Sequence, residues 1–210
     1  MLVTELIPAR RPGSRRLLVV LHGLGDSMEG WRWLPEILEV DDLNYLLVNA
    51  PDDYHGGFSW YDLYGGDPEP GIRRSRELLV RLLDAQVAAG FPSEQTALLG
   101  FSQGCLMTID VGFRYPRRLA GLVGISGYVW DPEALLRQRS PVAPQQRMLF
   151  THGSRDPLIP CADVKEQVDL LTAGGLPITW RVFDKVHTVA GAAEVDLIRS
   201  FLQEPVRVSN

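Results

Sequence analysis

The sequence predicts an α/β fold with a mainly parallel central sheet and helices on both of its faces. Strongly apolar runs of β type alternate with amphipathic helical patterns along the whole chain. The runs are continuous rather than alternating in polarity, which is typical of strands buried on both faces. Strands that alternate with helices in this way form βαβ units, so consecutive strands are expected to run in parallel.

The first central strand is predicted at 17–21, where Leu-Leu-Val-Val-Leu is uniformly apolar. The N-terminal segment 2–7 is expected to add an edge strand. Similar runs predict the remaining strands, at residues 45–50, 96–100, 119–126, 147–153 and 178–183.

Helical patterns fill the intervals between these strands. The longest, at 72–89, carries Leu79 and Leu83 on one apolar stripe, and Gly90 and Pro92 end it. The other helices are expected at residues 31–38, 103–115, 163–175 and 192–202.

Two long stretches, 51–71 and 130–146, have no regular pattern and are expected to be irregular. Loops of this length in a compact domain are usually functional or disordered, and the aromatic residues of 51–71 favour a functional role for it. Ligands of parallel sheets bind beyond the carboxyl ends of the strands, so functional residues are expected where strands end.

Composition limits the class of protein. A chain of 210 residues is expected to form one domain, residues 1–210, and its net charge of −5 argues against a nucleic-acid partner. No apolar window is long enough for a membrane span or a signal peptide. The two cysteines are too few for a disulfide framework. A cytoplasmic location is expected from these features.

Ser102 is the candidate nucleophile. It lies in Gly100-Phe101-Ser102-Gln103-Gly104, between a predicted strand and a predicted helix, which is the setting of a nucleophile elbow. The turn is so tight that the residues two before and two after the serine crowd each other. Gly100 and Gly104 are expected to relieve that crowding.

A serine nucleophile needs a base and an orienting acid, which in such folds follow it in the order Asp or Glu, then His. Among the four histidines, only His187 lies far enough downstream, just after a predicted strand. Asp156 follows the strand before that one and is the preferred acid. Asp184, in the loop of His187, is the alternative, and Asp131 also competes.

The developing oxyanion needs two preorganised N–H donors. The backbone N–H of Gln103, at the start of the helix, is expected to be one of them. The other is assigned to Leu24 in the glycine-rich loop after the first central strand, with Gly23 as the neighbouring alternative. His22 precedes the serine, so its ring is expected to pack and to anchor that loop.

No cofactor or metal is expected. The dinucleotide fingerprint fails because Met28 replaces its third glycine, and neither a P-loop nor zinc-ligand spacing occurs. The group of Asp52, Asp53 and His55 is interpreted as a polar turn.

Four motifs together resemble a known family, the small carboxylesterases and acyl-protein thioesterases of the α/β-hydrolase fold, over about residues 17–202. The motifs are Leu21-His22-Gly23-Leu24-Gly25-Asp26, Ser59-Trp60-Tyr61-Asp62-Leu63, Gly100-Phe101-Ser102-Gln103-Gly104 and Gly153-Ser154-Arg155-Asp156-Pro157.

The resemblance implies the same triad of Ser102, Asp156 and His187, and the same amides of Leu24 and Gln103 at the oxyanion hole. It also implies that Trp60 and Tyr61 line the substrate site, with core packing as their alternative role. The short spacings between the triad residues imply that no separate cap domain is present.

The chain departs from the family at two places. Val186 precedes His187 where a glycine is common, and segment 51–71 is unlike the thioesterase members, so a protein substrate is not expected.

The sequence therefore predicts a serine hydrolase that cleaves small-molecule carboxylic esters, with short to medium acyl chains favoured. Acyl-thioesterase or lysophospholipase activity with the same triad is the alternative. A binding module on a hydrolase scaffold is the alternative from another class, and a full catalytic set argues against it. A homodimer contact through the aromatic residues of 51–71 is left open.

Overall fold

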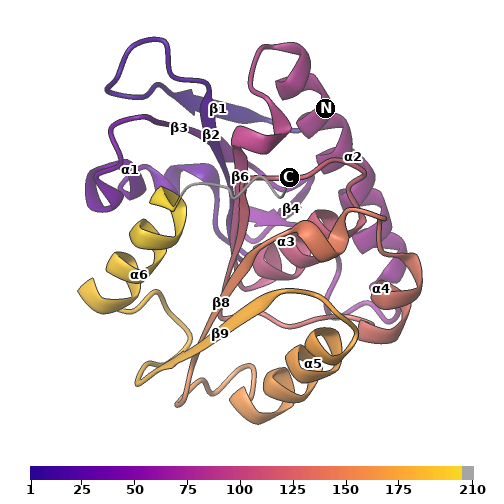
Figure 1. Ribbon diagram of the computed structural model, residues 1–210. Helices are drawn as coiled ribbons and strands as arrows, with labels where there is room; N and C mark the ends of the chain where they lie inside the picture. The colour runs from indigo at the N-terminus through magenta and orange to yellow at the C-terminus, as the bar shows by residue number, and fades with distance from the viewer. Residues whose placement is uncertain (205–210) are drawn as a thin grey trace.

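A computed structural model describes residues 1–204, within which seven strands form one sheet in the order β1-β3-β2-β6-β7-β8-β9 (Figure 1). Only β1 is antiparallel to its neighbour, so the prediction of a mainly parallel sheet with an N-terminal edge strand is confirmed. Residues 205–210 of the expected domain lie outside the described residues. The strands are β1 (Thr4–Ile7), β2 (Arg16–Leu21), β3 (Leu43–Val48), β6 (Thr96–Phe101), β7 (Gly121–Ile125), β8 (Met148–Gly153) and β9 (Ile178–Phe183).

Helices cover both faces of this sheet (Figure 1). On one face lie α1 (Leu34–Leu38) and α6 (Ala192–Gln203). On the other lie α2 (Glu69–Ala88), α3 (Gln103–Arg114) and α5 (Cys161–Ala173). No helix within residues 1–204 is both long and apolar enough to cross a membrane.

Two hydrophobic cores explain why the central strands are apolar at every position. In β2, Leu18 and Val20 face the core beneath α1 and α6, whereas Leu17 and Val19 face the core beneath α2, α3 and α5. All four side chains are at most 1% exposed. Because successive side chains of a strand point to opposite faces, a strand between two helical layers needs apolar residues throughout.

The sequence predicts that segment 51–71 is irregular, but the structure has a hairpin there, formed by β4 (Asp52–Tyr54) and β5 (Gly57–Ser59). His55 and Gly56 form its turn with positive φ angles of 46° and 88°. Phe58 exchanges backbone hydrogen bonds with Gly25 and Asp26 at 2.9 Å each. The hairpin therefore holds the loop that follows β2.

Segment 130–146 also differs from the prediction of an irregular loop, since it forms α4 (Pro132–Gln138) and the 3-10 turn η3 (Ala143–Gln145). The Asp131 carboxylate caps α4 by accepting a hydrogen bond from the Ala134 N–H at 2.8 Å. An aspartate followed by proline is a recognised helix start, and the signal was present in the sequence.

Candidate active site

Ser102 occupies the sharp turn between β6 and α3, at the carboxyl edge of the sheet. Its backbone has φ 53° and ψ −115°, a conformation that residues other than glycine rarely adopt. Its N–H donates to the Ile125 carbonyl of β7 at 2.9 Å, which holds the strained residue in place. Such strain persists only where the surrounding structure enforces it, and it is common at functional sites.

The two glycines of the elbow are required for different contacts. A Cβ on Gly100 would lie 2.0 Å from the carbonyl oxygen of Gly104, which confirms the predicted crowding across the turn. A Cβ on Gly104 would lie 2.1 Å from the carbonyl oxygen of Leu21, at the end of β2. The second glycine therefore also lets α3 begin directly against the neighbouring strand.

The structure brings His187 between Ser102 and Asp156. Its Nε2 lies 3.0 Å from the Ser102 Oγ, and its Nδ1 lies 2.7 Å from an Asp156 carboxylate oxygen. The carboxylate can only accept, so Nδ1 carries the proton of the neutral ring. Nε2 is then free to accept the proton of the serine hydroxyl, which is the geometry of a general base beside a nucleophile.

The Asp156 carboxylate is held ionised in the turn after β8. Burial favours a higher pKa, but hydrogen bonds from the Ile159 N–H, His187 and the Leu158 N–H outweigh it and lower the pKa. The His152 ring donates to the Ile159 carbonyl at 2.9 Å, which ties the turn to the end of β8. An ionised carboxylate here orients the His187 ring.

Neither alternative acid reaches the histidine. The Asp184 side chain is 80% exposed and pairs with Arg155. The Asp131 side chain caps α4. Asp156 is thus the one predicted acid that contacts His187.

A buried ion pair, not expected from the sequence, anchors the loop of His187 at both ends. The Lys185 ammonium lies 2.6 Å from the Glu194 carboxylate, and these side chains are only 3% and 0% exposed. The other Glu194 oxygen accepts a hydrogen bond from the Ala190 N–H. Glu194 lies at position i and Ile198 at position i+4 of α6, so both lie on its apolar stripe. A charged residue on such a stripe is a sequence signal for a buried partner.

Two backbone N–H groups beside Ser102 are available as oxyanion donors. Those of Leu24 and Gln103 have no protein acceptor within residues 1–204. Gln103 is the first residue of α3, where the helix dipole favours negative charge. Gly23, the alternative to Leu24, is also close to the nucleophile, since its ideal Cβ would lie 3.3 Å from that of Ser102.

The His22 ring anchors its loop, as predicted. Its Nε2 accepts from the Ala50 N–H at 3.1 Å, and its Nδ1 donates to the Gly23 carbonyl at 2.6 Å. The side chain is buried, and burial lowers its pKa. A neutral ring in this position links the loop after β2 to the end of β3.

A cleft of about 590 Å³, here called the serine cleft, opens at Ser102. Apolar and aromatic side chains from several segments of the chain form most of its lining. Its lining includes Leu24, Tyr61, Leu63, Tyr64, Phe101, Gln103, Tyr128, Leu158, Ile159 and Val164. Half of these residues lie in the sequence motifs, whereas Tyr64, Tyr128, Leu158, Ile159 and Val164 belong to none of them, so the sequence did not single these five out.

The expectation that Trp60 lines the substrate site is wrong, because its side chain is fully buried and is not part of the serine cleft. Its Nε1 donates to the His22 carbonyl at 2.9 Å, and its own N–H donates to the Gln103 side chain at 3.0 Å. Tyr61 does border the cleft, where its hydroxyl lies 3.0 Å from that of Tyr128. Trp60 therefore supports the site from within the core, whereas Tyr61 forms part of the lining of the serine cleft.

Within residues 1–204, no cluster of three or more histidine, cysteine or acidic side chains is arranged to hold a metal ion. Asp52, which belongs to the group interpreted as a polar turn, pairs with Arg74 of α2.

Replacing Gly104 with alanine is expected to lower the free energy of unfolding by about 3 kcal/mol, because the new Cβ would strike the end of β2. Gly90→Ala is the matched control, since a Cβ there meets nothing within 4 Å and only the φ of 101° is unfavourable. That strain costs about 1 kcal/mol. Urea unfolding measures both variants, and equal losses would contradict a role for the close contact.

Replacing Glu194 with glutamine is expected to lower the free energy of unfolding by about 3 to 5 kcal/mol, because Lys185 would be left buried without a counter-charge. The double variant Lys185→Met/Glu194→Gln keeps an acceptor for the Ala190 N–H and should recover most of the loss. Urea unfolding of the two variants tests this. A double variant no more stable than the single one would contradict the unpaired charge as the cause.

Comparisons with known proteins agree with this geometry. The sequence profile of the phospholipase/carboxylesterase family matches residues 4–204. Acyl-protein thioesterase 1 of Schizosaccharomyces pombe is 35% identical over 155 residues, 68% of this chain and 69% of that protein. Acyl-protein thioesterase 1 of Yarrowia lipolytica is 27% identical over 219 residues, 96% of either chain.

Among solved structures, esterase PE8 matches with a TM-score of 0.87 and 25% identity, over 97% of this chain and 99% of that one. The family profile and esterase PE8 match nearly the whole chain, and both agree with the parallel sheet, the elbow at its carboxyl edge and the helices on both faces. The chain therefore belongs to the phospholipase/carboxylesterase family of the α/β-hydrolase fold and is a hydrolase of the carboxylesterase type.

Proposed function

We propose that the protein hydrolyses carboxylic esters of small molecules through an acyl-enzyme on Ser102, with His187 as the base and Asp156 as the orienting acid. One observation carries this proposal: an unbroken chain of hydrogen bonds, 3.0 Å and 2.7 Å long, joins the three side chains at the mouth of the serine cleft. A nucleophile, a base and an orienter in this order are what acyl transfer requires.

In the first half of the reaction, His187 accepts the proton of Ser102 as Oγ attacks the ester carbonyl. The resulting oxyanion receives hydrogen bonds from the N–H groups of Leu24 and Gln103, each worth about 3 to 4 kcal/mol in such sites. His187 then gives its proton to the leaving oxygen, and the C–O bond breaks. In the second half, a water molecule gives a proton to His187 and attacks the acyl-enzyme. His187 then returns that proton to the Ser102 Oγ as the acyl C–O bond breaks, which releases the acid.

Thioesters are the second candidate class of substrate. The observation that favours them is the similarity to acyl-protein thioesterase 1 of Schizosaccharomyces pombe. The same triad serves both classes, because a thiolate leaves more easily than an alkoxide and needs less help from His187. A protein substrate is not part of the proposal.

Short to medium acyl chains are proposed as the preferred ones. The serine cleft offers apolar contacts from Leu63, Leu158 and Ile159, which suit an alkyl group. The hydrogen-bonded hydroxyls of Tyr61 and Tyr128 interrupt that apolar lining. A chain long enough to pass this pair gains less apolar contact for each added methylene.

Initial rates on p-nitrophenyl esters from acetate to palmitate test the proposal, with Ser102→Ala as the control. Wild-type protein is expected to be most active on the short and medium esters, and the variant to lose activity by a factor of about 10⁵ or more. A maximum at palmitate would contradict the proposed chain length. Equal rates in the variant and the wild type would contradict the role of Ser102.

Replacing Asp156 with asparagine is expected to lower kcat by a factor of about 10⁴, because an amide neither fixes the Nδ1–H tautomer nor stabilises the protonated ring. Steady-state kinetics on p-nitrophenyl acetate measures this loss. A kcat within tenfold of the wild type would contradict the assigned acid and would return Asp184 to consideration.

The same variant has a second expected effect, on stability. The folded pKa of Asp156 lies below its unfolded value, so its ionised form stabilises the fold above about pH 4, and this stabilisation is lost as pH falls through the folded pKa. The difference in unfolding free energy between the wild type and the Asn variant should therefore be smaller at pH 3 than at pH 7. Urea unfolding at both pH values measures the difference, and a constant difference would contradict the lowered pKa.

A further inference from the structure

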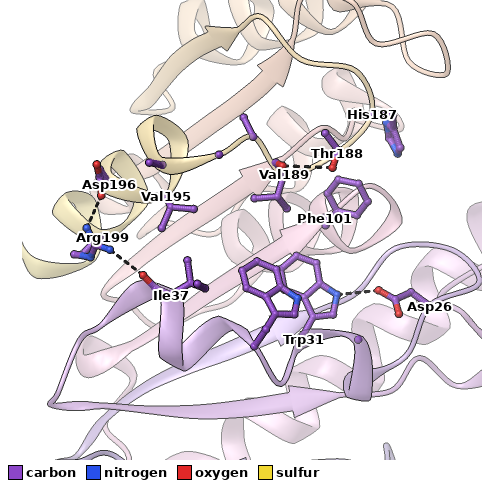
Figure 2. Close-up of a pocket in the computed structure, with 15 residues that line it drawn as sticks. Asp26, Trp31, Ile37, Phe101, His187, Thr188, Val189, Val195, Asp196 and Arg199 are labelled. Carbon is purple, nitrogen blue, oxygen red and sulfur yellow. Dashed lines mark hydrogen bonds and ion pairs between the residues drawn. The ribbon is translucent and has the colours of Figure 1, made fainter.

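A second cleft of about 720 Å³ lies on the other side of His187 from the serine cleft. It is here called the tryptophan cleft (Figure 2). One wall is the segment of η1 (Met28–Trp31) and α1, and the other is the end of the histidine loop with α6. Its lining includes Trp31, Trp33, Ile37, Val189, Val195 and Arg199.

The two clefts meet at a narrow wall. Phe101 and His187, whose ring centroids lie 5.0 Å apart, line both of them, as does Asp26. Ser102 and the two oxyanion donors line only the serine cleft. A group that passes over the His187 ring therefore moves from the nucleophile into the tryptophan cleft.

The floor of the tryptophan cleft is aromatic. The rings of Trp31 and Trp33 are stacked with centroids 5.6 Å apart, and the Trp31 Nε1 donates to the Asp26 carboxylate at 3.1 Å. Trp33 is 37% exposed and Ile37 is 47% exposed, so both offer apolar surface to a ligand. Such a floor suits a planar apolar group.

The charges around the cleft do not suit an anion. The Arg199 guanidinium is engaged by the carbonyls of Ile37 and Leu38 and by the Asp196 carboxylate. The Asp26 carboxylate stands at the wall between the clefts. An anionic ligand would meet two carboxylates and a cation that is already paired.

We propose that the tryptophan cleft binds the leaving group of the substrate and selects a neutral alcohol or thiol that carries a ring. This inference rests on the proposed function. In the tetrahedral intermediate the oxyanion points to Leu24 and Gln103, and the leaving oxygen must come within hydrogen-bond reach of the His187 Nε2 to receive its proton. The leaving group then lies on the His187 side, and the acyl chain lies in the serine cleft.

This assignment also ranks the alternatives for the substrate. A phosphorylated leaving group, as in a lysophospholipid, would bring negative charge against Asp26 and Asp196. Esters or thioesters of uncharged ring-bearing groups, such as benzyl or naphthylmethyl, fit the aromatic floor and the charge of the rim.

The experiment compares two series of esters by pH-stat, which detects the released acid. One series varies the alcohol of an acetate from methyl to benzyl to 2-naphthylmethyl, and the other varies the acyl chain of a methyl ester from acetate to octanoate. For Trp33→Ala, the ratio of kcat/KM for naphthylmethyl acetate to that for methyl acetate is expected to fall about tenfold. For the same variant, the ratio of kcat/KM for methyl octanoate to that for methyl acetate is expected to stay within twofold of the wild-type ratio.

Leu158→Ala is the matched control, because Leu158 is an exposed apolar residue of the serine cleft. This variant is expected to lower the kcat/KM ratio of methyl octanoate to methyl acetate and to leave the kcat/KM ratio of naphthylmethyl acetate to methyl acetate unchanged. Ile37→Ala provides a second variant of the tryptophan cleft should Trp33→Ala fold poorly, since the Ile37 side chain is half exposed. In the wild type, 4-carboxybenzyl acetate is expected to be at least tenfold poorer than benzyl acetate in kcat/KM.

The outcomes separate this inference from the proposed function. If the wild type hydrolyses esters and Trp33→Ala lowers the octanoate ratio instead of the naphthylmethyl ratio, the acyl chain occupies the tryptophan cleft and the inference is wrong. Unchanged ratios in both tryptophan-cleft variants also overturn it, while the esterase proposal stands. Hydrolysis of no ester in either series overturns the proposed function, and the inference with it.

Discussion

The close approach of α3 to the ends of β2 and β6 is the constraint on which the site depends. The backbone at Gly104 lies so near the Leu21 carbonyl that no side chain fits between them. This contact places the first turn of α3 at the edge of the sheet and leaves Ser102 no room for an ordinary backbone conformation. The strained φ of Ser102 follows from this contact, and Gln103, as the first residue of α3, presents at the same turn a backbone N–H with no protein acceptor within residues 1–204.

The other members of the site are held near this turn by hydrogen bonds and an ion pair within the scaffold. The turn after β8 wraps its own backbone N–H groups around Asp156. The histidine loop is tied to α6 through Glu194. The hairpin of β4 and β5 holds the loop of Leu24 by backbone pairing at Phe58. Each loop is therefore fixed by the scaffold, as preorganised acyl transfer requires.

The sequence predicts best what depends on local pattern. Continuous apolar runs located all the central strands, and the chain order Ser102, Asp156, His187 placed three distant residues at one edge of the sheet. The hairpin at 52–59 was missed because its strands have only three residues each and carry no apolar period. The helix after Asp131 was missed although its capping signal was present.

Features made by tertiary packing were beyond the sequence. Trp60 shares a motif with Tyr61, but only the packing of the chain decides that its ring points into the core. The Lys185–Glu194 pair joins a loop to a helix, and although the position of Glu194 on an apolar stripe signals a buried partner, it does not say that the partner is Lys185. The tryptophan cleft lies between η1–α1 and α6, which are more than 150 residues apart and meet through Arg199.

The attachment of the histidine loop to α6 makes the two walls of the tryptophan cleft unequal. Through Glu194, α6 holds the loop that carries His187, and through Val195 it also forms one wall of the tryptophan cleft. Reshaping that wall would also disturb the attachment of this loop. The opposite wall, with Trp33 and Ile37, holds no member of the triad. A substitution at Trp33 or Ile37 thus reshapes the tryptophan cleft from the short segment between β2 and β3, without touching a residue that holds the loop of His187.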